Sequence, residues 1–392
     1  MGNGGGGVRI IDTDTHVSEP EDLWTSRVST SRWGDLVPHA RWDPELEERV
    51  WWWAGEPTQM GTGWAAMAGW KGYPPDHPPS LAEADPAAWN PVDRLARMDE
   101  YGIYAHVLYP NIGGFGSNRF IRLPDPELRL ACVRAYNDFL AEWLDVDRHR
   151  FIPIMALPFW DLDASLRELE RCAALGHKGI LATGDPDRYG QPPLADPYWD
   201  RLWAAAQDHE LTINFHVGNS DDIDLKGGWG GVGRQTTNAK TGVTFFLANA
   251  RHILEVIATG ICHRFPRLNF VSVESGVGWI PFVLEALDWQ WANFNCVSEH
   301  PEMDLLPSEY FRRQVYGSFW FEKASLRAAI DVLGPDNLLY ETDFPHPTSM
   351  SPGPATIAVR PAEYVADALA GQPADVVEKI LYGNAARIYH LD

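Results

Sequence analysis

Short apolar runs of strand length recur along the chain, and stretches with helical periodicity lie between them. The runs occupy residues 8–14, 103–109, 151–157, 179–183, 211–216, 268–274, 315–321 and 337–343. Apolar residues at three- and four-residue spacings predict helices over 126–145, 162–175, 197–209, 251–265 and 325–333, and a closing helix over 373–389. Strands that alternate with helices favour a parallel α/β architecture, and eight strands close a (β/α)8 barrel. A doubly wound open sheet is the alternative, although no GxGxxG turn follows the first run.

Two long segments interrupt this alternation. Residues 18–91 contain nine of the 18 tryptophans, and 217–248 are rich in Gly and Asn. We therefore expect one domain over residues 8–392, a TIM barrel with a long Trp-rich insertion after the first strand. The insertion would leave the barrel face that carries active sites, so it either caps the site or forms a satellite hydrophobic cluster. The segment 217–248 is predicted to be a mobile wall or an oligomer contact, and we expect a homodimer.

Composition excludes several classes of protein. The net charge of −22 argues against nucleic-acid or anionic-membrane partners, and no run of 18 apolar residues predicts a membrane span. Residues 1–7 lack the basic and apolar regions of a signal peptide and are expected to be a flexible, Gly-rich lead. The four cysteines lie far apart without a CxxC pair, so neither a disulfide framework nor a zinc-thiolate site is predicted. We expect a cytoplasmic enzyme that acts on a small molecule.

Potential metal ligands stand at the ends of three of the predicted strands. Asp14 and His16 are two residues apart on the first, so their side chains point the same way. His216 ends the fifth run and Asp343 ends the eighth. Each pattern is weak alone, but a barrel would bring the three strand ends to one mouth, where buried charges need a partner or a metal. These four residues form the predicted ligand set for zinc, manganese or iron.

Further ionisable residues are expected near the same mouth. Glu274 ends the sixth run and could be a general base, a ligand that bridges to a second metal, or a partner for an arginine. His346, three residues beyond Asp343, is a candidate for proton transfer. Glu19 and Glu341 are additional candidates.

Four motifs occur in order along the chain: IDTDTHVSEP at 11–20, ESGVGWIP at 274–281, TDFPH at 342–346 and GNAARIY at 383–389. Together they resemble the amidohydrolase family 2, which includes the aminocarboxymuconate semialdehyde decarboxylase-like enzymes. The resemblance implies a (β/α)8 barrel with a divalent metal. By that likeness Asp14 and His16 match the first-strand ligand pair, and His216 and Asp343 match the fifth- and eighth-strand ligands. The decarboxylases carry a catalytic histidine on the sixth strand, where this chain has Glu274.

Two enzyme mechanisms remain open at this level. In the first, one metal polarises a carboxylate, a carbonyl or a bound water, and Glu274 or His346 moves the proton. This predicts decarboxylation or hydrolysis of a carboxylated or acyl small molecule with an apolar body. In the second, the carboxylate-rich shell with Glu274 holds two ions in a non-heme diiron oxygenase. A barrel that binds a ligand without catalysis is the third alternative.

Overall fold

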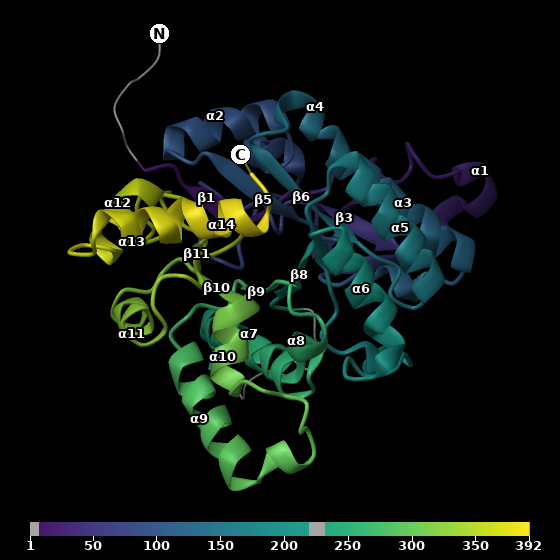
Figure 1. The fold of residues 1–392 in the computed structure, drawn as a ribbon. Coiled ribbons are helices and arrows are strands. Elements are labelled where there is room, and N and C mark those ends of the chain that lie inside the picture. Colours follow the sequence, from purple (N-terminus) through teal and green to yellow (C-terminus); the bar gives the residue numbers. More distant parts are fainter. Residues whose placement is uncertain (1–7, 219–231, 392) are drawn as a thin grey trace.

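The computed structural model describes residues 8–218 and 232–391, and its centre is a parallel barrel (Figure 1). Eight strands are hydrogen-bonded in the order β1 (Ile11–His16), β5 (Ala105–Tyr109), β6 (Phe151–Ala156), β7 (Gly179–Leu181), β8 (Thr212–His216), β9 (Phe270–Val273), β10 (Val315–Phe319) and β11 (Leu338–Tyr340). The first and last strands meet where the Asp343 amide donates to the Asp14 carbonyl (3.0 Å) and the His16 amide donates to the Phe344 carbonyl (2.7 Å). The predicted barrel is confirmed, and all eight strands fall within the predicted runs or extend them by two residues.

Helices surround the barrel and cover its outer face (Figure 1). The helix α5 (Leu162–Leu175) shows why they form: the Asp161 side chain accepts from the Ala164 amide at its start, and Gly176 ends it in a left-handed conformation. The other outer helices are α2 (Pro91–Tyr101), α3 (Pro126–Glu142), α4 (Leu144–Asp147), α6 (Asp200–Asp208), α7 (Arg234–Ala258), α8 (Ile261–Arg264), α9 (Ile280–Asn293), α10 (Pro307–Gln314), α11 (Ala324–Leu333), α12 (Pro361–Ala368), α13 (Ala374–Glu378) and α14 (Asn384–Ile388).

The segment between β1 and α2 folds against the loops at the C-terminal ends of the barrel strands. It contains the short helix α1 (Thr30–Trp33) and an antiparallel sheet of β2 (His39–Asp43), β3 (Glu48–Trp53) and β4 (Glu56–Gly61). Trp24 packs edge-on against Trp53 at 5.5 Å, and the Trp53 indole donates to the Arg119 carbonyl (2.9 Å). The Met67 amide donates to the Pro345 carbonyl (2.8 Å). These contacts attach the segment to the barrel mouth; its action as a cap stays a prediction.

Two predictions of local structure need correction. The interruption of the alternating strands and helices over 217–248 is wrong for its second half, because α7 begins at Arg234; a mobile wall or an oligomer contact stays a prediction. Tertiary contacts hold this helix: the Asn249 amide donates to the Phe215 (2.8 Å) and Val273 (3.0 Å) carbonyls of neighbouring strands. The predicted closing helix over 373–389 is interrupted by a π-helical turn, η8 (Lys379–Gly383). The expectations for residues 1–7 and for the Gly-rich stretch within 219–231 lie outside the described residues.

The helices bear on one further expectation. In the parts of the chain that the structure describes, none of them has the length and apolar character needed to span a membrane.

Candidate metal centre

Ionisable side chains from four strand ends meet at the C-terminal mouth of the barrel. The His16 Nε2 atom lies 3.3 Å from Asp14 Oδ1, 3.5 Å from Asp343 Oδ1 and 3.1 Å from His216 Nε2. Glu274 follows β9, and its Oε2 atom lies 3.5 Å from His216 Nε2. The structure therefore brings together all of the predicted ligands and Glu274, although β1 and β11 are more than 300 residues apart in the sequence.

The potential ligand atoms form two overlapping groups. Within each group, all of the atoms lie within 4.8 Å of one another: Asp14, His16, His216 and Glu274 in the first, and His16, Glu274, Asp343 and His346 in the second. Glu274 is common to both, whereas Asp14 and Asp343 fall in different groups. The predicted four-residue set is therefore divided between the two groups, and Glu274, like His16, belongs to both.

The two central imidazoles are oriented for metal binding. His16 Nδ1 lies 2.8 Å from the Pro110 carbonyl, and His216 Nδ1 lies 2.8 Å from the Val217 carbonyl. Because a carbonyl oxygen only accepts, each Nδ1 carries a hydrogen, so the Nε2 atoms of the neutral rings present lone pairs. These two lone-pair atoms are 3.1 Å apart. Between neutral rings such a contact is repulsive, and a cation shared by the two atoms, either a proton or a divalent metal, makes it favourable. Against the effect of burial, the Asp14 carboxylate raises the pKa of His216 in the same sense.

The buried carboxylates of the site would also be stabilised by a nearby cation. Both side-chain oxygens of Asp14 and of Asp343 are buried without a hydrogen-bond donor in good geometry. Burial and the nearby Glu274 and Asp14 carboxylates raise the pKa of Asp343 well above its ordinary value. Burial also raises the pKa of Glu274 to about 8, against the opposing effect of His216. For Asp14, His216 and His16 outweigh burial and lower the pKa. A donor set of imidazole nitrogens and carboxylate oxygens fits zinc, manganese or iron.

Backbone strain directs two of the carboxylates. Glu274 has a φ of 53° and Asp343 a φ of 59°, both in the left-handed region that side-chain-bearing residues seldom adopt. The Glu274 amide is held by Glu341 Oε2 (3.2 Å), and the Asp343 amide by the Asp14 carbonyl (3.0 Å). Residues held in such conformations cluster at active sites, where surrounding contacts offset the strain.

His346 lies against the ligand cluster. Its Nδ1 atom is 2.8 Å from Asp343 Oδ1, and its Nε2 atom is 2.5 Å from Asn111 Oδ1. The ring stacks on His16 with centroids 3.6 Å apart. His346 thus reaches the site as predicted and is placed either to bind metal or to transfer a proton. Asn111 was not predicted, although a polar residue just after the second barrel strand, β5, is the signal that could have found it.

Two buried residues support the site without joining the ligand cluster: Glu19, which was a predicted candidate, and Arg94, which was not. Glu19 accepts from the Asn111 (2.9 Å) and Ile112 (3.1 Å) amides, so it positions the loop after β5 and is not in the ligand cluster. Arg94, on α2, is completely buried and donates to the His16 carbonyl (2.6 Å). Its helix has an ordinary amphipathic pattern, which gave no signal of this role.

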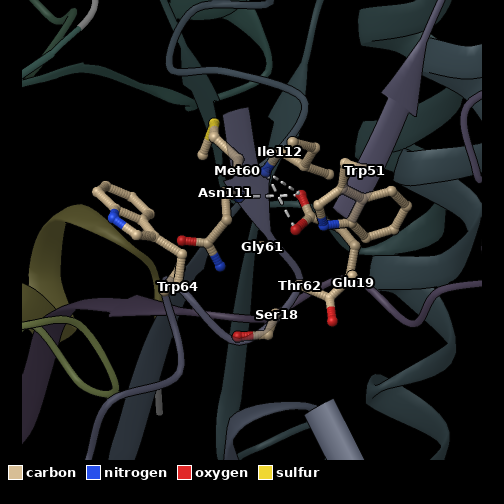
Figure 2. Close-up of a pocket in the computed structure, with 10 residues that line it drawn as sticks. Ser18, Glu19, Trp51, Met60, Gly61, Thr62, Trp64, Asn111 and Ile112 are labelled. Carbon is tan, nitrogen blue, oxygen red and sulfur yellow. Dashed lines mark hydrogen bonds between the residues drawn. The ribbon is translucent and has the colours of Figure 1, made fainter. Parts of the chain in front are cut away.

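A small pocket lies beside the centre, between the insertion and the loops that follow β1 and β5 (Figure 2). It is lined by Ser18, Glu19, Trp51, Met60, Gly61, Thr62, Trp64, Ala65, Asn111 and Ile112. Figure 2 shows the Glu19 carboxylate bonded to the loop amides. Asn111 joins the pocket to the centre, because it also contacts His346. The insertion thus contributes aromatic side chains to a pocket beside the candidate metal ligands.

Comparison with known proteins places these features in a family. A family model described as Amidohydrolase matches residues 11–391. A gamma-resorcylate decarboxylase from a Rhizobium species is 29% identical over 262 residues, which cover 64% of this chain and 76% of that protein. The crystal structure of an amidohydrolase from Mycobacterium avium subsp. paratuberculosis has a TM-score of 0.76 at 22% identity, covering 97% of this chain and 99% of that one. The structure of a dihydroxybenzoic acid decarboxylase from a Polaromonas species, with bound manganese and 2-nitroresorcinol, has a TM-score of 0.63 at 19% identity, covering 98% of each chain.

Proposed function

We propose that this chain, which belongs to the amidohydrolase family, is a manganese-dependent decarboxylase that removes a carboxylate from a flat, aromatic small molecule without oxidation. The family match and the decarboxylase relatives identify a metal-dependent enzyme of the hydrolase and carboxy-lyase kind. The choice of decarboxylation over hydrolysis is supported by the gamma-resorcylate decarboxylase relative. Manganese is supported by its presence in the Polaromonas decarboxylase structure.

One observation carries the proposal. Two histidines whose Nδ1 atoms are committed to carbonyl oxygens face each other through Nε2 atoms 3.1 Å apart, beside buried carboxylate oxygens without donors. Asp14, His16, His216 and Asp343 would hold the metal, with Glu274 close enough to share in binding it. When bound, the metal would supply a Lewis acid that anchors the oxygens of the substrate and offsets their negative charge.

The protein would then have to deliver a proton to carbon. In the proposed reaction, the ring carbon that bears the carboxylate accepts a proton, the bond from that carbon to the carboxylate breaks, and CO2 leaves while the bonding electrons remain on the ring. We assign the proton donor to Glu274, which stands where the decarboxylases that this chain resembles have a catalytic histidine. His346, stacked on His16 and hydrogen-bonded to Asn111, would orient the site.

The insertion supports a flat substrate. Trp51 and Trp64 line the pocket that Asn111 connects to the ligand cluster. Aromatic walls favour flat apolar bodies, and a metal beside them favours a carboxylate on that body. We therefore propose an aromatic carboxylate as the substrate, with the insertion covering it.

The test is a CO2-release assay on metal-free protein that has been reconstituted with manganese, with gamma-resorcylate as the first of a series of phenolic carboxylates. We expect CO2 release without oxygen uptake, at about one manganese per chain. His216→Ala should abolish both metal binding and CO2 release, whereas His149→Ala, at an exposed position just before β6 and so at the opposite end of the barrel, should change neither. Two irons per chain with substrate-dependent oxygen uptake would overturn the proposal in favour of the diiron oxygenase. Activity of the metal-free protein would overturn both.

A further inference from the structure

We propose that a basic pocket at the opposite end of the barrel binds a small molecule that carries two or more phosphate groups. The pocket has a volume of about 480 Å³, within the usual range for small-molecule sites. It is lined by Asn269, Arg312, Arg313, Tyr316, Asp336, Arg387 and Ile388. None of these residues has a place in the metal centre or in the proposed reaction.

The chain order of the lining residues fixes the position of the pocket. Asn269 directly precedes β9, and Arg312 and Arg313 lie in the last turn of α10, directly before β10. Asp336 precedes β11 by two residues. The pocket therefore lies at the N-terminal ends of these parallel strands, whereas the metal ligands lie at the C-terminal ends. A ligand bound here occupies a site separate from the substrate.

The guanidinium groups of the pocket are held by neutral acceptors. Arg387 donates to the Tyr316 hydroxyl (3.1 Å), and Arg312 donates to Ser308 Oγ (3.2 Å). Arg313 donates to the Cys262 carbonyl (2.5 Å) and to the side chain of its neighbour in the sequence, a glutamine (2.6 Å). These bonds orient the side chains and leave other N–H groups free to donate to a ligand.

Negative charge on the protein does not offset these arginines. Within residues 8–218 and 232–391, none of Arg312, Arg313 and Arg387 forms an ion pair with a carboxylate. The only acidic lining residue, Asp336, is already paired with Lys379 at 2.5 Å. Three uncompensated positive charges converge here in a chain whose net charge is −22. Such a cluster repels itself, and a bound anion would relieve that repulsion.

Guanidinium geometry and charge point to phosphate. The N–H donors of a guanidinium group form a planar fork that binds phosphate oxygens in pairs. Three guanidinium groups can surround more than one phosphate. The Tyr316 hydroxyl accepts from Arg387, so its own hydrogen remains available to a ligand oxygen. The acidic surface elsewhere disfavours a nucleic acid, and a pocket of this volume fits a small molecule.

The experiment uses isothermal titration calorimetry with fructose 1,6-bisphosphate as the probe, on full-length protein at a fixed free concentration of manganese so that chelation is constant. We expect saturable binding to the wild type that weakens as salt rises. The double variant R312Q/R387Q should bind at least about tenfold more weakly, because charge-assisted hydrogen bonds to the anion are lost. All of the substituted side chains are exposed, so the fold should survive, and circular dichroism checks this.

Two further samples make the result specific. R201Q removes an exposed arginine that is paired with Asp163 outside the pocket, and it should bind the probe like the wild type. Citrate, of similar charge but without phosphate, should bind more weakly than the bisphosphate. The proposal is overturned if the wild type shows no saturable binding up to about 10 mM, if R312Q/R387Q binds as tightly as the wild type, or if citrate binds as well as the bisphosphate.

Discussion

Replacing Asp343 by asparagine should have opposite effects on the metal-free and metal-loaded protein. Asparagine is nearly isosteric and tolerates the left-handed φ of 59° at this position better than other residues do. In the metal-free protein, the substitution removes a buried carboxylate whose oxygens have no hydrogen-bond donor in good geometry and which lies near the Glu274 and Asp14 carboxylates. With manganese, it removes a ligand. We therefore expect Asp343→Asn to stabilise the apoprotein and to abolish the stabilisation by metal.

The magnitudes follow from burial and chain length. An unsatisfied buried polar group costs about 1–3 kcal/mol. For 392 residues, the unfolding entropy is about 0.8 kcal/mol/K at about 2.1 cal/mol/K per residue, so the apoprotein Tm should rise by about 1–4 °C. Metal at about 1,000 times its Kd stabilises the wild type by about 4 kcal/mol, which corresponds to about 5 °C. The variant should lose this second shift.

Differential scanning calorimetry with EDTA or with added manganese measures both shifts, and elemental analysis gives the metal content. Asp331→Asn, the same substitution at an exposed position on α11, is the matched control and should change neither. The assignment of Asp343 as a ligand is refuted if Asp343→Asn retains the metal-dependent shift. The electrostatic reasoning is refuted if the variant apoprotein melts below the wild type.

Three other changes test separate parts of the molecule. Glu274→Gln should lower kcat for CO2 release by about 100-fold or more while manganese is retained, because it removes the proposed proton donor; an unchanged kcat contradicts that role. Arg94→Met should lower the free energy of unfolding by about 3 kcal/mol, because it leaves buried carbonyls such as that of His16 without a donor. Urea titration measures this free energy, and a loss below about 1 kcal/mol refutes the prediction. Burial lowers the pKa of His177 to about 4 in the folded protein. On acidification the unfolded chain therefore binds a proton at this histidine before the folded protein does, so lowering the pH from 6.5 to 4 should reduce the free energy of unfolding by about 3 kcal/mol. His177→Gln should make the pH dependence of the urea midpoint shallower over that interval, and an unchanged slope would contradict the effect.

The barrel strands were predictable because their signal is local. A strand buried on both faces is an apolar run of five to seven residues, and parallel connections place turns and helices between such runs. The boundaries of the observed strands accordingly lie within three residues of the predicted ones. The part of helix α7 before residue 251 was missed because it is polar and rich in Thr and Asn, and its contacts with β8 and β9 are made by residues such as Asn249.

The candidate ligands were predictable by type and by strand position. Asp14, His16, His216 and Asp343 follow from the rule that parallel strands present their C-terminal ends at one mouth. Their binding of a metal stays a prediction, as do the homodimer and the role of the insertion as a cap. The position of Asn111 just after β5 could have marked it as a candidate, but its contact with His346, 235 residues away, depends on the tertiary structure.

The sequence by itself determined the barrel, the family and the identity of the residues at its mouth, because strand periodicity and motif order are properties of short segments. Tertiary structure alone decided how these residues face one another. The lone pairs of His16 and His216 converge only because Pro110 and Val217, on different loops, accept from their Nδ1 atoms. The arginine pocket at the other end likewise exists only through packing, since Arg312 and Arg387 lie on separate helices that the closed barrel brings together. Electrostatic interactions depend on distance in space, and distance in space is what the linear sequence leaves open.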